Sequence, residues 1–519
     1  MGFPSDGKKM EPPRHTTVIL PATAQSLRIA RSGEAILFPS CSFLTRGLVA
    51  RIGAVAVGAI ALVTACAPAE PPVRATDEEP AVALVSAPSA AMVTSAMVTS
   101  ADTRLGELIE NTPGSVVAGE RLNVELLRRF YARHGFAPVW TNRQGQAESL
   151  MNAVSRAGDH GLAPELFHAY VLRSPATVPA LDRELLLSNA FLSYADALAR
   201  GVMPVERRKD DQVLAPEPID VAAVLDVALG SPDPAAVIEA LAPATPTYRA
   251  LRQALQDLRA GTAVRGKTET TRLRALEVNL ERERWLPRRL PPDRVRVNVA
   301  DGQLVLYRDD HPVFSTRVIV GQDDSRNQSP EFQASIEGLW FNPPWNIPSD
   351  IATQEILPKA SRDPNYLARR NMVLLPDGGL QQAAGANSGL GQLMFYMNNR
   401  FDVYLHDTPS KNLFSRDDRR ISHGCIRVEE PRKLAALLMR QPVDAIDQAI
   451  ATGTTTWGTL PKPVPVFVVY ETAFADVDGK LQFRADIYGR DAEIWQSLDP
   501  KRRERRVVAE RAAPDQRQR

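Results

Sequence analysis

Cysteine is scarce in this sequence, and only one cysteine falls in the part of the chain that is predicted to fold. The 519 residues include three cysteines, Cys41, Cys66 and Cys425. The first two lie in or beside a predicted export signal. A lone cysteine cannot form an internal disulfide, so Cys425 is either an inert side chain or a nucleophile.

The sequence also lacks an excess of charge, metal-binding spacings and a long apolar run. Its net charge is +1, which gives no strong field toward nucleic acid or an anionic membrane surface. It contains no CxxC, HExxH or paired-histidine spacing, so we expect neither a metal nor another cofactor. Hydrophobic residues make up 44% of the chain, enough for folded cores.

The N-terminal region resembles a bacterial export signal. Arg46 and Arg51 precede twelve apolar or small residues, 52–63. This run is short for a membrane span of about 20 residues, but it suits a secretory signal. The segment Val63–Cys66 resembles a lipobox, in which Cys66 would receive lipid; an uncleaved anchor is the alternative. We therefore expect a periplasmic or cell-envelope protein that is tethered to the membrane through its N-terminus.

Apolar spacing predicts an α+β fold. Residues 181–198 repeat apolar side chains every three or four positions and stop before Gly201 and Pro204, as expected for a helix. Val295–Val299 and Leu304–Tyr307 flank Asp301-Gly302, which predicts a hairpin. Further strands are predicted at Val318–Gly321 and Val466–Tyr470.

Composition and patterning together predict six segments. They are an extension with the signal and lipobox (1–66), a linker rich in Ala, Pro, Ser and Thr (67–102), a helical domain (103–260), a short linker (261–271), a β-rich domain with a mixed excursion at about 349–400 (272–495), and a charged tail (496–519).

The one thiol of the predicted folded part lies in Ser422-His423-Gly424-Cys425-Ile426-Arg427. A free thiol has a pKa of about 8.5, so a nearby imidazole that accepts its proton would make the thiolate available. His423 is two residues away and His406 is nineteen residues upstream.

His406 is the predicted base. It ends the run Phe401–His406, which is predicted to be a strand, and residues 407–421 are predicted to be a surface loop. A strand that returns beside the first one would bring His406 next to Cys425. His423 would then shape the turn or help bind an oxyanion, and Gly424 would let backbone N–H groups approach the reacting carbonyl.

The order of residues argues against related thiol enzymes. Papain-like and NlpC-type hydrolases place the cysteine before the histidine, and no histidine follows Cys425 here. Sortases place the histidine first, but with a longer gap and without His-Gly beside the thiol.

His406, fifteen residues, and then Ser422-His423-Gly424-Cys425 resembles the signature of the L,D-transpeptidase (YkuD-type) catalytic domain. Flanking segments are similar to its YcbB-like subgroup of peptidoglycan crosslinking enzymes. These segments are Asn279–Arg282 with Arg284–Pro287, Phe341–Pro348, Glu355–Lys359, Tyr404–Ser410, Leu413–Ser415 and Phe483–Asp491. The resemblance covers roughly residues 103 to 495 and implies a helical scaffold followed by a β-rich, sandwich-like catalytic domain with a lid over the active site.

The resemblance implies acyl transfer between peptidoglycan stem peptides, donor and acceptor. Cys425 would attack a tetrapeptide stem, release D-alanine and pass the thioester to a second stem as a 3→3 crosslink. The backbone carbonyl of Asp407 would orient His406. Carbapenem-type β-lactams would inhibit the enzyme. The implied substrate-binding residues are Ser422, Tyr404, Trp345 and Arg427, with packing as the alternative role for Tyr404 and Trp345.

One departure and two alternatives remain. Many subgroup members insert a peptidoglycan-binding module between the scaffold and the catalytic domain. A domain that folds alone needs at least about 40 residues, so residues 261–271 are too few for such a module. The same thioester could instead join a protein to the wall, be hydrolysed or trim stems. A noncatalytic wall-binding lipoprotein is the alternative from another class.

Overall fold

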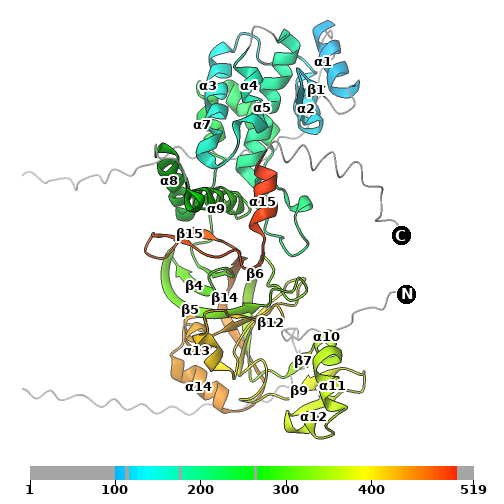
Figure 1. The fold of residues 1–519 in the computed structure, drawn as a ribbon, viewed down its shortest axis with the longest axis vertical. Helices are drawn as coiled ribbons and strands as arrows, with labels where there is room; N and C mark the ends of the chain where they lie inside the picture. Colours follow the sequence, from blue (N-terminus) through cyan, green and yellow to red (C-terminus); the bar gives the residue numbers. More distant parts are fainter. Residues whose placement is uncertain (1–99, 112–115, 175–177, 262–265, 500–519) are drawn as a thin grey trace, which may run out of the picture. The chain divides into compact units, whose positions relative to one another are not determined.

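The computed structural model of the chain describes residues 100–111, 116–174, 178–261 and 266–499 (Figure 1). The predicted signal, Cys66, most of the predicted linker and nearly all of the charged tail lie outside these residues. Of the helices described, none has both the length and the apolar character that a bilayer crossing requires.

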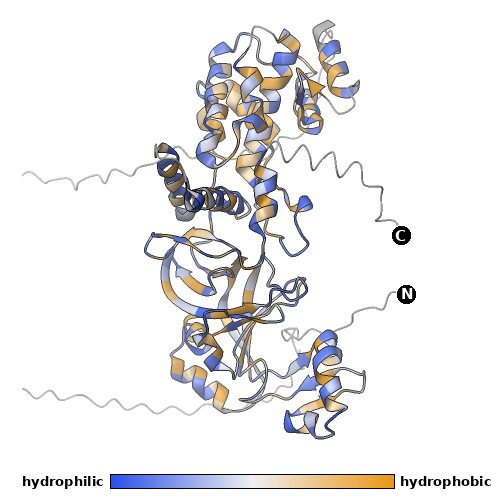
Figure 2. Cartoon of the chain, viewed as in Figure 1, coloured by the Kyte–Doolittle hydropathy of each residue, from blue (hydrophilic) through white to orange (hydrophobic). Residues whose placement is uncertain are grey.

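The N-terminal half is a helical domain with one main core and a smaller apolar cluster around Tyr248, Leu251 and Leu255. The predicted helix at 181–198 is confirmed as α5 (Ala180–Arg200), whose buried side chains pack against the surrounding helices. Apolar and polar residues are interleaved along these helices, as Figure 2 shows. The other elements are α1 (Ser100–Asn111), β1 (Val116–Val117), β2 (Glu120–Arg121), α2 (Val124–Tyr131), α3 (Gln144–Ser155), α4 (Ala169–Leu172), α6 (Val221–Gly230), α7 (Pro234–Glu239) and α8 (Pro246–Ala260).

Helix α9 (Lys267–Glu283) joins the two halves and corrects one predicted boundary. Residues from Lys267 onward were expected in a linker, but they form the first turn of α9. The C-terminal half of α9 is buried, and Asn279 exchanges side-chain and backbone hydrogen bonds with Thr472. Tertiary contacts of the C-terminal half of α9 therefore stabilise a helix whose first turn the local composition predicted as a linker.

The C-terminal half is built on one nine-stranded mixed sheet. Its order is β12-β5-β13-β11-β10-β6-β14-β3-β4, and β4 also pairs with β5, so the sheet closes on itself. The strands are β3 (Arg294–Asn298), β4 (Gln303–Arg308), β5 (His311–Gly321), β6 (Phe332–Phe341), β10 (Leu393–Met397), β11 (Leu405–His406), β12 (Arg420–Ser422), β13 (Ile426–Val428) and β14 (Thr456–Val469). The predicted fold class, a helical domain followed by a β-rich one, is confirmed.

Several predicted strands are confirmed in this sheet. β3 and β4 form the predicted antiparallel hairpin around Asp301-Gly302, where Gly302 has a positive φ of 62°. The predicted strand at 318–321 is the end of β5, and the one at 466–470 is the end of β14.

One face of the sheet forms the core of this domain. Leu339, Phe395, Leu405 and Ile426 come from four neighbouring strands and are fully buried. Helices α13 (Pro431–Met439) and α14 (Val443–Ala451) add Leu434, Leu438 and Ile446 to the same core. The last elements pack on the helical half: β15 (Ala473–Ala475), paired with β16 (Leu481–Phe483), contacts α8 and α9, and α15 (Asp491–Leu498) adds Ile494 and Leu498 to the helical core.

The excursion expected at about 349–400 is a small subdomain between the end of β6 and the start of β10. Its strands form the sheet β7-β9-β8, and its helices α10, α11 and α12 lie together beside it (Figure 1). It has its own apolar cluster, which includes Ile347, Ile356 and Met372. The bounds are β7 (Trp345–Ile347), α10 (Ser349–Ile351), a π-helix (Ala352–Ile356), α11 (Leu357–Ala360), α12 (Tyr366–Arg369), β8 (Met372–Leu374) and β9 (Leu380–Gln382).

The strand predicted over Phe401–His406 is wrong in its length. Only Leu405 and His406 form β11, and Asp402 has a positive φ of 51°, which breaks an extended chain. The side chain of Asn399 accepts hydrogen bonds from two backbone N–H groups of this segment and donates to the carbonyl of Val403. A side chain therefore satisfies backbone groups that a longer strand would pair with a neighbour.

A buried carboxylate cluster links α9 to the sheet and makes stability depend on pH. Burial raises the pKa of Glu283 to about 8, the negative charge of Glu471 acts in the same direction, and Arg296 opposes them. An unfolded glutamate has a pKa of about 4.3, so between these pH values only the unfolded state releases the proton. The stabilising contribution is therefore full at low pH and is lost as pH rises through about 8.

We predict that Glu283→Gln removes this pH dependence, because glutamine resembles the protonated acid and does not ionise. Urea unfolding of both proteins at a series of pH values measures it. The free energy of unfolding of the wild type, relative to the variant, should fall from pH 5 to pH 8. A difference that is constant, or that grows with pH, would contradict the assignment.

Candidate active site

The catalytic turn, residues 422–425, passes over the end of β5. β12 pairs with β5 in parallel on one side, and β13 pairs with it antiparallel on the other. The chain therefore crosses from one neighbour of β5 to the other within these residues, at Gly321. Gly424 has a φ of 106°, a conformation that favours glycine, and this explains why the tight crossing needs it.

The side chain of Ser422 stabilises the turn through hydrogen bonds to its backbone. It is buried, and its Oγ donates to the carbonyl of Cys425 at 2.6 Å and accepts from the N–H of Gly424 at 3.2 Å. Ser422 was predicted to bind substrate and Gly424 to line the oxyanion region. In this conformation the Ser422 hydroxyl and the Gly424 N–H both have partners within the turn.

Ser329 is a positioning residue that the sequence did not reveal. It is fully buried, and its Oγ donates to the carbonyl of Gly424 at 2.8 Å and accepts from the N–H of Gly321 at 3.0 Å. The hydroxyl of Tyr488 donates to the carbonyl of Gly321 at 2.6 Å. Ser329 thus links the catalytic turn to the end of β5 from a loop nearly a hundred residues away in the sequence.

The register between β11 and β13 places His406 and Cys425 on one face of the sheet. The strands are parallel, with Leu405 opposite Ile426 and His406 opposite Arg427. Leu405 and Ile426 are fully buried on the core face. Because side chains alternate along a strand, His406 and Arg427 point to the other face, and Cys425 precedes Ile426 on that same side.

The backbone carbonyl of Asp407 accepts a hydrogen bond from Nδ1 of His406 at 2.6 Å. In a neutral ring the proton on Nδ1 leaves the lone pair on Nε2. Burial and, to a smaller extent, the positive charge of Arg427 lower the pKa of His406 to about 4, although the carbonyls of Asp407 and Leu390 oppose this. The imidazole is therefore neutral at pH 7 and able to accept a proton.

The thiol of Cys425 is also neutral at rest. Burial raises its pKa, while a backbone interaction with Tyr404 and the charge of Arg427 lower it by less. The residue keeps some exposed surface, and its Sγ lies 3.8 Å from the carbonyl oxygen of Asp402, to which it donates. No hydrogen bond between this thiol and His406 is found among the described residues, and such bonds are often formed only once substrate is bound.

Arg427 is a cation without a carboxylate partner in the described part of the chain. Burial lowers the pKa of Arg427, and its interaction with Cys425 raises it by less. Its Nε is buried and has no acceptor there. A half-buried guanidinium beside a nucleophile can bind an anionic group of a substrate.

His423 contacts the excursion and not the thiol. Its Nε2 lies 2.5 Å from a carboxylate oxygen of Glu355, which belongs to the π-helix. The predicted lid therefore reaches the catalytic turn. Glu355 was not predicted as a site residue, because nothing in its spacing links it to a turn 68 residues later.

Two aromatic residues of the predicted binding set lie in different places. Tyr404 is half-buried on the Cys425 side, and its ring stacks on that of Tyr396 with centroids 6.1 Å apart. Trp345 lies in β7 and packs so closely on Gly389 that a side chain there would collide with its ring. In this conformation Trp345 therefore packs within the excursion.

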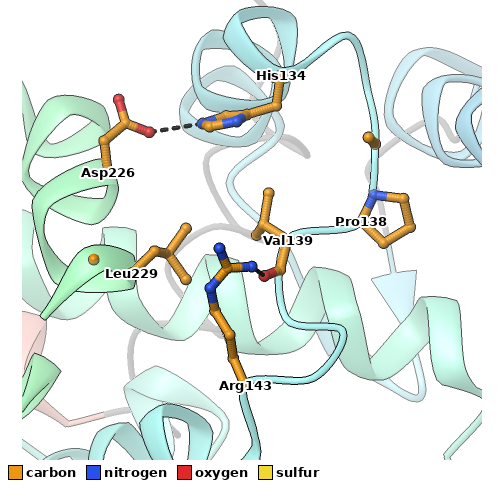
Figure 3. Close-up of a pocket in the computed structure, with 8 residues that line it drawn as sticks. His134, Pro138, Val139, Arg143, Asp226 and Leu229 are labelled. Atoms are coloured by element: carbon orange, nitrogen blue, oxygen red, sulfur yellow. Dashed lines mark hydrogen bonds and ion pairs between the residues drawn. The ribbon is translucent and has the colours of Figure 1, made fainter. Parts of the chain in front are cut away.

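A cavity of about 430 Å³ lies in the helical domain, where His134 and Asp226 are joined by a hydrogen bond (Figure 3). Val139, Leu229 and Arg143 also line it. None of its lining residues belongs to the catalytic turn, and we assign it no chemistry. No group of side chains in the described residues could hold a metal ion.

Comparison with known proteins gives the class. Residues 125–255 match a family model described as a scaffold domain, and residues 292–466 match the L,D-transpeptidase catalytic domain. A Haemophilus influenzae protein named "Putative L,D-transpeptidase" is 28% identical over 399 residues, which cover 71% of this chain and 78% of the relative.

Solved structures with weak likeness carry the same name. An L,D-transpeptidase from Mycobacterium smegmatis is 13% identical, over 34% of this chain and 58% of the solved chain, with a TM-score of 0.19. An E. faecium catalytic domain acylated by ertapenem is 12% identical, over 35% and 99%, with a TM-score of 0.19. The chain thus spans less than two thirds of the M. smegmatis protein, and we draw nothing further from scores this low.

Residues 292–466 are an L,D-transpeptidase catalytic domain that follows a scaffold domain at residues 125–255, and this domain makes the chain an acyltransferase-type transpeptidase. The family acts in peptidoglycan crosslinking, on stem peptides. The YcbB-like subgroup stays a prediction.

We predict that Cys425 behaves as a hindered neutral thiol when no substrate is bound. The rate of its alkylation by iodoacetamide, corrected with Cys425→Ala for the other cysteines, should rise with an inflection above the ordinary thiol value of about 8.5. The reason is that burial outweighs the positive charge of Arg427. An inflection well below pH 7 would indicate a resting thiolate–imidazolium pair and contradict the assignment.

Proposed function

We propose that the protein forms 3→3 crosslinks between tetrapeptide stems of peptidoglycan, with Cys425 as nucleophile and His406 as base. The observation that carries the proposal is the parallel register that puts both residues on one sheet face, within a domain of the L,D-transpeptidase family. The shared face and the neutral imidazole suit thiol acyl transfer.

The proposed reaction has two steps that balance. In the first, His406 takes the thiol proton as Sγ attacks the carbonyl of the third stem residue. The peptide bond to D-alanine breaks, the leaving amine receives that proton, and a thioester remains on Cys425. In the second, the side-chain amine of another stem attacks the thioester, gives its proton to His406 and releases the thiolate, which regains that proton. The bond broken supplies the free energy for the bond made.

The low pKa of His406 sets how the proton moves. A base with a pKa of about 4 holds the thiol proton poorly, so the transfer must be coupled to attack on the carbonyl. It also returns the proton readily to the departing amine of D-alanine. A low pKa therefore suits His406, which must accept a proton and donate it again within the same step.

Arg427 supplies the proposed contact to the stem. Peptidoglycan stems carry carboxylates, and this guanidinium has no acidic partner in the described part of the chain, while it lies near both reacting groups. A charge-assisted hydrogen bond to a substrate carboxylate would hold the reacting carbonyl over Sγ and would give the guanidinium an acidic partner.

We place the protein in the cell envelope, tethered at its N-terminus. Support comes from the basic flank, the apolar run at 52–63 and the lipobox-like Val63–Cys66. The uncleaved anchor remains the alternative form of the tether. Either would hold the enzyme on the side of the membrane where its substrate lies.

Muropeptide turnover tests the function. Incubation of the protein with tetrapeptide muropeptides should give, by mass, a crosslinked dimer together with free D-alanine. Cys425→Ala should give neither. His406→Ala should lose about 10²–10⁴ in rate, the usual worth of positioned proton transfer.

His311→Ala is the matched control, because His311 is exposed at the start of β5 and belongs to no part of the site. It should leave the rate unchanged. A wild type that releases shortened stems without a dimer would indicate a trimming enzyme. Turnover that survives in Cys425→Ala would overturn the proposed nucleophile.

We also predict that a carbapenem acylates Cys425, because its strained β-lactam carbonyl is a target for the same thiol. The intact mass of the protein should increase by one drug molecule, and this increase should be absent in Cys425→Ala. A wild type whose mass stays unchanged after prolonged exposure would count against a reactive thiol at this position.

A further inference from the structure

A row of side chains runs straight across the sheet from the catalytic base to β14. His406 is opposite Met394 of β10, Met394 is opposite Trp340 of β6, and Trp340 is opposite Trp457 of β14. Arg427 continues the row on the other side of His406. Because directly opposite residues share a sheet face, both tryptophans lie on the face that carries the reacting groups.

The two tryptophans form part of a continuous aromatic surface. Their centroids are 5.0 Å apart, and the ring of Trp457 lies 5.9 Å from that of Tyr396, which in turn stacks on Tyr404. Gly338 makes room for this surface, because a side chain there would collide with the Trp457 ring. Trp340 and Trp457 are both half-buried, so part of each indole remains accessible.

The tryptophan pair lies at a fixed distance from the reaction centre. β11 and β14 are three strand positions apart in the sheet. With about 4.8 Å between neighbouring strands, Trp457 is roughly 14 Å from His406 across the face. The tryptophan pair and the reaction centre therefore share one continuous face of the sheet, so a substrate that extends from the reaction centre can contact both.

We propose that Trp340 and Trp457 bind a pyranose ring of the glycan strand that carries the donor stem. This inference rests on the proposed function. The C–H groups on one side of a pyranose ring are attracted to the negative face of an indole, and tryptophan combines a large apolar area with a polar N–H. The buried Nε1 of Trp340 has no acceptor in the described residues, so the pair retains an unused donor for a sugar oxygen.

The length of the stem fits this position. The stem is joined to its sugar through its N-terminal end, and the reacting carbonyl belongs to the third residue. Three extended residues span at most about 11 Å, and the lactyl link to the sugar adds to that span. Cys425 adjoins β13, which lies three strand positions, roughly 14 Å, from Trp340 on β6. A stem that lies across the strands from Cys425 therefore brings its sugar to the Trp340 side of the tryptophan pair.

Comparing two donor substrates tests this subsite. The rate of D-alanine release, as kcat/KM, is measured with a bare tetrapeptide and with the same tetrapeptide on its disaccharide. The wild type should prefer the disaccharide form, and in Trp457→Ala the ratio of the two values should fall by up to about tenfold. Trp457→Phe retains an aromatic face and should keep most of the preference.

Trp495→Ala is the matched control. Trp495 is also partly buried, but it lies in α15 beside Arg274, and its loss should leave the ratio unchanged. The rate of carbapenem acylation reports whether each variant still folds. A wild type without preference for the disaccharide, or equal losses of Trp457→Ala on both substrates, would overturn the subsite. A wild type that turns over neither substrate would overturn the proposed function itself.

Discussion

The parallel pairing of β11 with β13 is the constraint on which the site depends. It is short, only Leu405–His406 against Ile426–Arg427, and a slip of one residue would turn His406 into the core. Full burial of the two apolar partners fixes the register, because exchanging faces would expose them and bury charged or polar groups. Packing in the core thus positions the chemistry on the opposite face.

The proposed catalytic residues are held by groups to which the proposed reaction assigns no step. Ser422 and Ser329 satisfy the polar backbone of the turn, and the carbonyl of Asp407 fixes the ring of His406. Burial makes both reacting groups neutral, with a raised pKa for the thiol and a lowered pKa for the imidazole. In the proposed reaction the same burial would limit the access of water, which competes with an amine for the thioester.

The sequence predicted the parts that depend on local pattern. The hairpin at Asp301-Gly302 follows from turn chemistry, and the return of the chain at Cys425 to a strand beside that of His406 follows from a short motif. It did not predict the roles of Ser329 and Glu355, because both reach the turn across long stretches of chain. It also overestimated the strand before His406, since a capping side chain, Asn399, replaced the ladder there. The fold class, a helical domain followed by a β-rich one, was right, but α9 began earlier than its composition indicated.

The central claim is that a sulfur on this sheet face carries the acyl group while a neighbouring imidazole moves the proton. The most direct measurement is the acid-quenched mass of the protein, with peptide mapping, after brief mixing with a tetrapeptide donor that lacks an acceptor. The account predicts an adduct on Cys425 equal to the stem without its D-alanine, formed far more slowly in His406→Ala. An adduct on another residue, or one that forms equally fast without the imidazole, would contradict it.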